Sequence, residues 1–220
     1  MGTFPKDFLW GTSQSGHSIE GANFASDWWR WEQRPGRVAH RATSEEAARF
    51  LENHLRDLDQ ARDLGHRAFL FSLEWSRIQP KEEGFDEGAI EVYRGIFEAI
   101  QRRGLEPVCA LQHNTLPRWF AERFGWHHRE ARARFRVYAE RVIAEFAPFC
   151  RWWIPVREPM HWITMACIER RWPGPKRGAM RASAVSSCDS TALARMVRAS
   201  FCVSTSAVVR PMSWRFSGDS

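Results

Sequence analysis

The sequence lacks the features that mark membrane proteins, metal sites and secreted proteins. Its longest apolar runs are far shorter than a membrane span, and the first five residues contain no apolar secretory segment, so a cytoplasmic location is expected. The five cysteines are scattered and odd in number, with no CxxC or Cys/His ligand spacing. This pattern predicts free thiols, no metal and no other cofactor.

A contiguous basic block is also missing, although the formal net charge is +6. Many basic residues, such as those in 129–134, recur at the spacing of a solvated helix face. Nucleic-acid binding would rest on charge alone, so no nucleic-acid partner is expected. Twelve tryptophans are present instead. Tryptophan packs against sugar rings as well as in cores, so their number favours a carbohydrate cleft, with core packing the alternative for most of them.

Apolar β-type runs alternate with segments of helical periodicity. Helices are expected at 45–64, 87–103 and 129–146, and strands at 8–12, 67–73, 107–111 and 152–156. Ser44 is a candidate cap for the first helix, while Gly65 and Gly104 end the first two. The order β-α-β-α-β-α-β, with nearly continuous apolar strands, predicts an α/β fold with a parallel sheet covered by helices.

Polar residues follow the carboxyl end of each expected strand, at 13–20, 74–77, 112–113 and 157–158. A dinucleotide-binding fold would need a GxGxxG turn after the first strand, and 11–16 lacks that spacing. The pattern therefore favours about four βα units, the N-terminal half of a (β/α)8 TIM barrel, whose catalytic face lies at the strand carboxyl ends.

Composition changes near residue 178. Residues 181–220 hold 10 serines and no Glu or Lys, whereas the first 180 residues hold 7 serines. We expect a partial TIM-barrel domain at 1–178 and an irregular serine-rich tail at 179–220.

Glu158 is the candidate catalytic acid. It follows a strand, precedes Pro159 and has Trp152, Trp153 and Trp162 nearby in sequence, a setting that can raise a carboxyl pKa. Hydrolysis of a glycoside with retained configuration needs such an acid and a second carboxyl group about 5–5.5 Å away. A glutamate followed by proline is a weak signal alone, and a capping or salt-bridged glutamate is the ordinary alternative.

A set of motifs strengthens this interpretation, because together they resemble the opening half of family 1 glycoside hydrolases, the β-glucosidases and β-galactosidases. The resemblance covers about residues 4–178 and implies a TIM barrel that hydrolyses terminal β-linked glycosides. The motifs, in chain order, are Phe4–Gly11, Ile19–Ala22, Phe71–Ile78, Gly104–Val108, Leu111–His113, Leu116–Trp119, Phe124–Trp126 and Glu158–Pro159.

The resemblance implies roles for several positions. Glu158 matches the acid/base, His113 matches the histidine that binds sugar hydroxyls, and Trp126 lies in a structural turn. Three substrate-site positions depart from the family pattern, with Ser18 for glutamine, Leu70 for arginine and Arg157 for asparagine. Ser18 is too short for the bidentate glutamine contact. Arg157 should lower the Glu158 pKa, and its guanidinium either fills sugar space or points away, leaving the 2-hydroxyl without its partner.

The family nucleophile, a glutamate in a Glu-Asn-Gly context, has no counterpart in this sequence. After Glu158 the only acids are Glu169, Asp189 and Asp219, and Glu20 and Glu74 are expected in structural salt bridges. The sequence therefore predicts a truncated β-glycosidase with little turnover by itself. The alternative is a non-catalytic sugar-binding half-barrel. Either chain would expose sheet edges, so self-association is expected.

Overall fold

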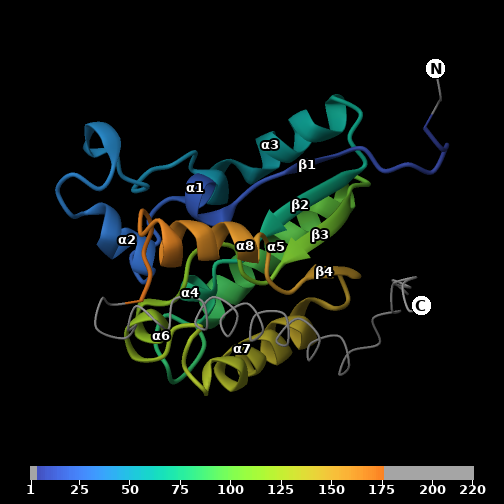
Figure 1. Cartoon of the computed structure of the whole chain (residues 1–220). Coiled ribbons are helices and arrows are strands. Elements are labelled where there is room, and N and C mark those ends of the chain that lie inside the picture. The colour runs from blue at the N-terminus through green and yellow to red at the C-terminus, as the bar shows by residue number, and fades with distance from the viewer. Residues whose placement is uncertain (1–3, 176–220) are drawn as a thin grey trace, which may run out of the picture.

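A computed structural model describes residues 4–175. Its sheet is parallel, with strands in the order β1 (Gly11–Ser13), β2 (Ala68–Ser72), β3 (Glu106–Ala110) and β4 (Trp152–Ile154). Figure 1 shows the four strands side by side. The predicted α/β fold and half-barrel order are confirmed. The tail expected at 179–220 and its boundary at 178 lie outside the described residues.

Three long helices connect the strands: α3 (Phe50–Asp63), α5 (Glu87–Arg102) and α7 (Ala131–Phe146). Local sequence fixes both ends of α5. The Asp86 side chain accepts the Ala89 N–H at its start, and Gly104 follows its end with a φ of 69°. Shorter helices are α1 (Gly16–Glu20), α2 (Asp27–Glu32), α4 (Trp75–Ile78), α6 (Arg118–Arg123) and α8 (Pro159–Trp162), with a 3-10 turn at Ala39–Arg41 and a π-helical turn at Ile163–Ile168.

Two predicted boundaries are wrong. The first long helix begins at Phe50, not at residue 45, and Ser44 does not cap it. The backbone N–H and hydroxyl of Ser44 instead donate to the carboxylate of Glu32, at 3.0 and 2.7 Å. The first strand begins at Gly11, and Phe8 in the segment before it is exposed. For the helix, a contact distant in sequence overrode local propensity. For the strand, the segment before Gly11 lacks the packing that its local propensity would need.

The two faces of the sheet are packed differently. Phe69 and Phe71 point to the helix side, where Phe71 packs against Phe97 of α5 with ring centroids 5.0 Å apart. The opposite face carries the register row Ser13, Leu70, Val108 and Trp152, none of which is fully buried. This face is the one that lines the interior of a closed barrel.

Within residues 4–175, none of the helices combines the length and apolar character needed to cross a membrane. The same residues contain no cluster of histidine, cysteine and acidic side chains able to hold a metal ion. Cys109 and Cys150 are buried thiols, and burial raises the pKa of each. Cys188 and Cys202 lie outside the described residues.

Candidate active site

The carboxyl ends of the strands bring the candidate residues together. His113 follows β3, Arg157 and Glu158 follow β4, and a parallel bridge joins His113 to Arg157. The Arg157 N–H donates to the carbonyl of Gln112 at 2.9 Å, which extends the β3–β4 pairing by these residues. Two segments 45 residues apart therefore present their side chains at one edge of the sheet.

Glu158 has a backbone conformation that is rare for its residue type. Its φ and ψ are 52° and 47°, in the left-handed region, directly before Pro159 at the start of α8. A residue before proline is kept out of the ordinary helical region, and a left-handed glutamate is held there only by its surroundings. The turn lifts the carboxylate to the surface, where 45% of the side chain is exposed.

The imidazole of His113 connects Glu158 to the end of β1. Its Nε2 lies 3.2 Å from Glu158 Oε2, and its Nδ1 lies 3.0 Å from the hydroxyl of Ser15. Burial is the largest influence on His113 and its pKa is below the usual value, so the ring is neutral at pH 7. A neutral ring with its proton on Nε2 donates to Glu158 and accepts from Ser15.

The pKa of Glu158 is lowered, first by the hydrogen bond from His113 and then by the charge of Arg157 among smaller causes. The expectation that the nearby tryptophans raise this pKa is wrong, because the carboxylate is too exposed for desolvation to dominate. The expectation that Arg157 lowers it is confirmed. Near neutral pH the carboxyl group is ionised, the state of a general base and not of a general acid.

Arg157 reaches across the ends of the two edge strands. Its Nη1 donates to the carbonyl of Gln14 at 3.0 Å and its Nη2 donates to the hydroxyl of Ser13 at 2.8 Å. Nη2 also lies 3.6 Å from Glu158 Oε1. The guanidinium therefore lies over the strand ends, where it links the segment after β4 to the end of β1.

The other two departures from the family pattern lie apart from this contact network. Ser18 is exposed on α1, and its hydroxyl donates to the Ser15 carbonyl at 2.9 Å within its own turn. Leu70 is half-buried on the inward sheet face, in register with Ser13. The structure thus groups His113, Arg157 and Glu158 and leaves Ser18 outside their hydrogen bonds.

Three site residues were not predicted from the sequence. Ser15 supports His113, and Asn114 Nδ2 lies 3.1 Å from His113 Nε2. His161 Nδ1 lies 3.6 Å from Glu158 Oε2 and its ring lies against Trp172, with centroids 4.7 Å apart. The position of His161, three residues after Glu158, was a signal available in the sequence, because such pairs meet on a helix.

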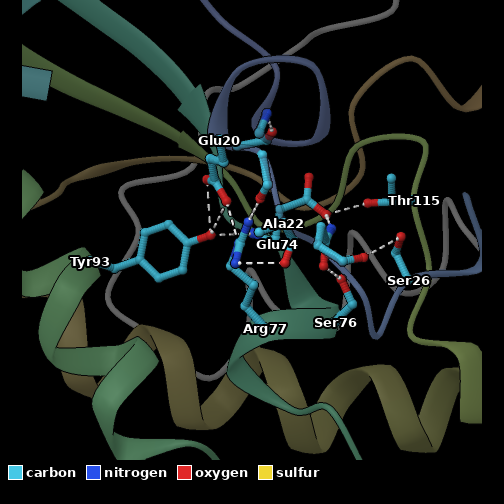
Figure 2. A network of polar contacts seen from close by, with 12 residues as sticks. Glu20, Ala22, Ser26, Glu74, Ser76, Arg77, Tyr93 and Thr115 are labelled. Carbon is cyan, nitrogen blue, oxygen red and sulfur yellow. Dashed lines mark hydrogen bonds and ion pairs between the residues drawn. The ribbon is translucent and has the colours of Figure 1, made fainter. Parts of the chain in front are cut away.

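A second, buried polar network involves Glu20 and Glu74 (Figure 2). The Glu20 carboxylate pairs with Arg77 at 2.7 Å and accepts a hydrogen bond from the hydroxyl of Tyr93 at 2.9 Å. Glu74 Oε2 accepts from Asn23 Nδ2 at 2.7 Å and from the Thr115 hydroxyl at 2.6 Å. The predicted salt bridge is confirmed for Glu20, whereas Glu74 is held by neutral donors.

Burial sets the protonation of this network. Desolvation, followed by the nearby Glu74 charge, raises the pKa of Glu20 to about 7, and desolvation raises that of Asp27 to about 7. The pKa of Glu74 is also raised, chiefly by burial, and its Oε1 has no hydrogen-bond partner. An unpartnered oxygen in a buried acidic pair is the natural place for a proton.

None of these acids contacts Glu158. The hydrogen bonds and ion pairs of the Glu158 carboxylate within residues 4–175 are to His113, Arg157 and His161. Glu169 is exposed and lies 3.7 Å from Arg171, while Asp189 and Asp219 lie outside the described residues. Trp126 is buried against Phe120 and Phe135, in keeping with a structural role.

Comparison with known proteins places the chain among sugar hydrolases. Residues 1–209 match the sequence model of glycosyl hydrolase family 1. A coniferin β-glucosidase of Pinus contorta is 30% identical over 163 residues, 71% of this chain and 32% of its own length. β-Glucosidase A of Acetivibrio thermocellus is 28% identical over 163 residues, 71% of this chain and 36% of its own length.

Solved structures agree in fold. A β-glycosidase from Pyrococcus horikoshii superposes with a TM-score of 0.78 at 31% identity, covering 89% of this chain and 44% of that one. The Thermotoga maritima β-glucosidase in complex with deoxynojirimycin superposes with a TM-score of 0.81 at 25% identity. The match covers 91% of this chain and 46% of that one. The chain spans about a third of the length of the curated relatives it matches.

Proposed function

Because this chain belongs to glycosyl hydrolase family 1, we propose that it supplies the acid/base half of a retaining β-glycosidase site for terminal β-linked glycosides. The observation that supports this most is the contact between Glu158 and His113, at the carboxyl ends of adjacent strands. Glu158 would serve as the acid/base, and His113, Arg157 and Ser18 would face the sugar.

The mechanism needs a proton donor and a nucleophile on opposite sides of the anomeric carbon. Within residues 4–175, Glu158 has no carboxylate among its contacts; Glu20 and Glu74 belong to the buried network, and the Asp27 carboxylate accepts from the Leu116 N–H. The lowered pKa of Glu158 also leaves the proton donor mostly ionised. We therefore propose that this half-site alone gives little turnover and that the nucleophile must come from another segment.

Turnover of aryl β-glucosides and β-galactosides tests the proposal. The full chain should release no more phenol than the Glu158→Gln variant. Turnover that this substitution abolishes would overturn the claim that the chain is inactive by itself, while supporting the role of Glu158.

The second candidate is a non-catalytic sugar-binding half-barrel, favoured by the guanidinium of Arg157 beside Glu158, where it is bonded to Gln14 and Ser13. Calorimetric titration with glucose, galactose and cellobiose distinguishes the two, since a binding module must bind one of them at millimolar concentration. Self-association through the open sheet edges stays a prediction, as does a cytoplasmic location. A monomer by light scattering, with a cooperative melt, would contradict self-association.

A further inference from the structure

The half-buried arginines of the described residues share one feature that Arg157 lacks. There are six, and five of them donate a direct hydrogen bond to a carboxylate. The pairs are Arg77 with Glu20, Arg94 with Glu145, Arg103 with Asp59, Arg134 with Glu130 and Arg141 with Glu87. This is the expected state, because a guanidinium taken from water needs a compensating charge.

Arg157 has neutral hydrogen-bond partners instead. Its two bonds go to the Gln14 carbonyl and the Ser13 hydroxyl, and a guanidinium has five N–H donors. The one carboxylate oxygen within 4 Å in residues 4–175 is Glu158 Oε1, at 3.6 Å, beyond hydrogen-bonding distance. With 20% of its side chain exposed, Arg157 remains reachable from solvent.

The groups around Arg157 do not neutralise its positive charge, so an anionic ligand could. His113 is neutral, and Glu158 Oε2 is engaged by His113 and faces His161. An anionic group that formed a forked pair with Arg157 would be repelled by an ionised Glu158, and protonation of Glu158 would relieve that repulsion. Binding of an anion would thus offset the charge that disfavours the acid form of Glu158.

We propose that Arg157 is a specificity-determining residue, which makes this site select a glycoside whose sugar carries a carboxylate or a phosphate over a neutral sugar. The inference rests on the proposed function, because it names the substrate class of the same site. It also accounts for an arginine next to the acid/base, since the charged substrate itself restores the proton that catalysis needs.

Calorimetry on the full chain at low salt tests this with methyl β-D-glucoside, methyl β-D-glucuronide and methyl β-D-glucoside 6-phosphate. One of the two anionic sugars should bind at least about tenfold more tightly than the neutral one, as charge-assisted hydrogen bonds would give. Whichever anionic sugar binds more tightly identifies the group. Repeating the titration in buffers of different ionisation enthalpy should show proton uptake, a signal that a merely structural arginine would not produce.

Two variants and one control make the test specific. Arg157→Asn should abolish the preference, and Arg157→Lys, which keeps the charge without the fork, should weaken it. Arg67→Asn removes the same charge from an exposed position at the opposite end of β2 and should leave the preference intact. Circular dichroism establishes that each variant is folded.

Several outcomes would overturn the inference. Equal affinity for all three sugars, or a preference that survives in folded Arg157→Asn, would refute it and leave the proposed function standing. Failure of the wild-type chain to bind any of the three sugars at tens of millimolar would overturn both.

Discussion

His113 Nε2 and Glu158 Oε2 lie 3.2 Å apart, and this hydrogen bond is the largest influence on the Glu158 pKa. Replacing His113 with Ala should therefore raise the Glu158 pKa toward its ordinary value. Carbon-13 NMR titration of the glutamate carboxyls, assigned with Glu158→Gln, measures it. Arg157→Asn should also raise the Glu158 pKa, by less than His113→Ala does. A pKa unchanged in both variants would show that neither His113 nor Arg157 controls the pKa of the carboxylate.

The buried acids predict that stability falls as pH rises toward neutrality. Glu20 and Asp27 have folded-state pKa values of about 7, above their unfolded values, so between about pH 4.5 and 7 the folded chain binds more protons than the unfolded chain. The free energy of unfolding should drop by at least about 1 kcal/mol across that window. The raised pKa of His17 acts in the same direction. Urea unfolding at pH 5, 6, 7 and 8 measures this, and a rise in stability would refute it.

Tyr93 is a structural member of the buried network. Its hydroxyl donates to Glu20 and accepts the Glu74 N–H, so Tyr93→Phe removes one of the two donors to the buried Glu20 carboxylate and leaves the Glu74 amide without its partner. The cost should be about 2–3 kcal/mol in the free energy of unfolding. Tyr138→Phe is the matched control, because that buried hydroxyl donates only to the neutral Leu111 carbonyl. Equal losses in the two variants would argue against the importance of Glu20.

Gly16 of α1 packs against the Glu74 side chain of the same network. A Cβ there would lie 2.6 Å from Glu74 Oε1 and 2.9 Å from its Cγ, so Gly16→Ala should destabilise by about 1–3 kcal/mol. Gly95 is also helical but has open space around it, and Gly95→Ala should stabilise by about 0.5–1 kcal/mol. Chemical unfolding of the two variants in parallel checks the opposite signs, and a harmless Gly16→Ala would contradict the packing.

The sequence predicts the order of strands and helices because apolar periodicity is a local property. It also predicts that His113, Arg157 and Glu158 meet, since parallel strands share a carboxyl edge. Contacts between distant segments could not be predicted from local sequence. One example is the hydrogen bond from Ser44 to Glu32, which replaces the expected cap of the first long helix. The direction of the Glu158 pKa shift could not be predicted from the sequence either, because it depends on contacts between distant segments. Nearby tryptophans and an adjacent arginine act in opposite directions, and the outcome depends on the exposure of the side chain and on the hydrogen bond from His113.

The most direct test of the central claim combines residues 4–175 with the part of a relative that they do not match. Residues 4–175, joined to the C-terminal half of the Thermotoga maritima β-glucosidase, should hydrolyse aryl β-glycosides, and Glu158→Gln should reduce the rate by at least about 100-fold. A folded chimera whose turnover is unchanged by Glu158→Gln would contradict the assignment of Glu158 as the acid/base.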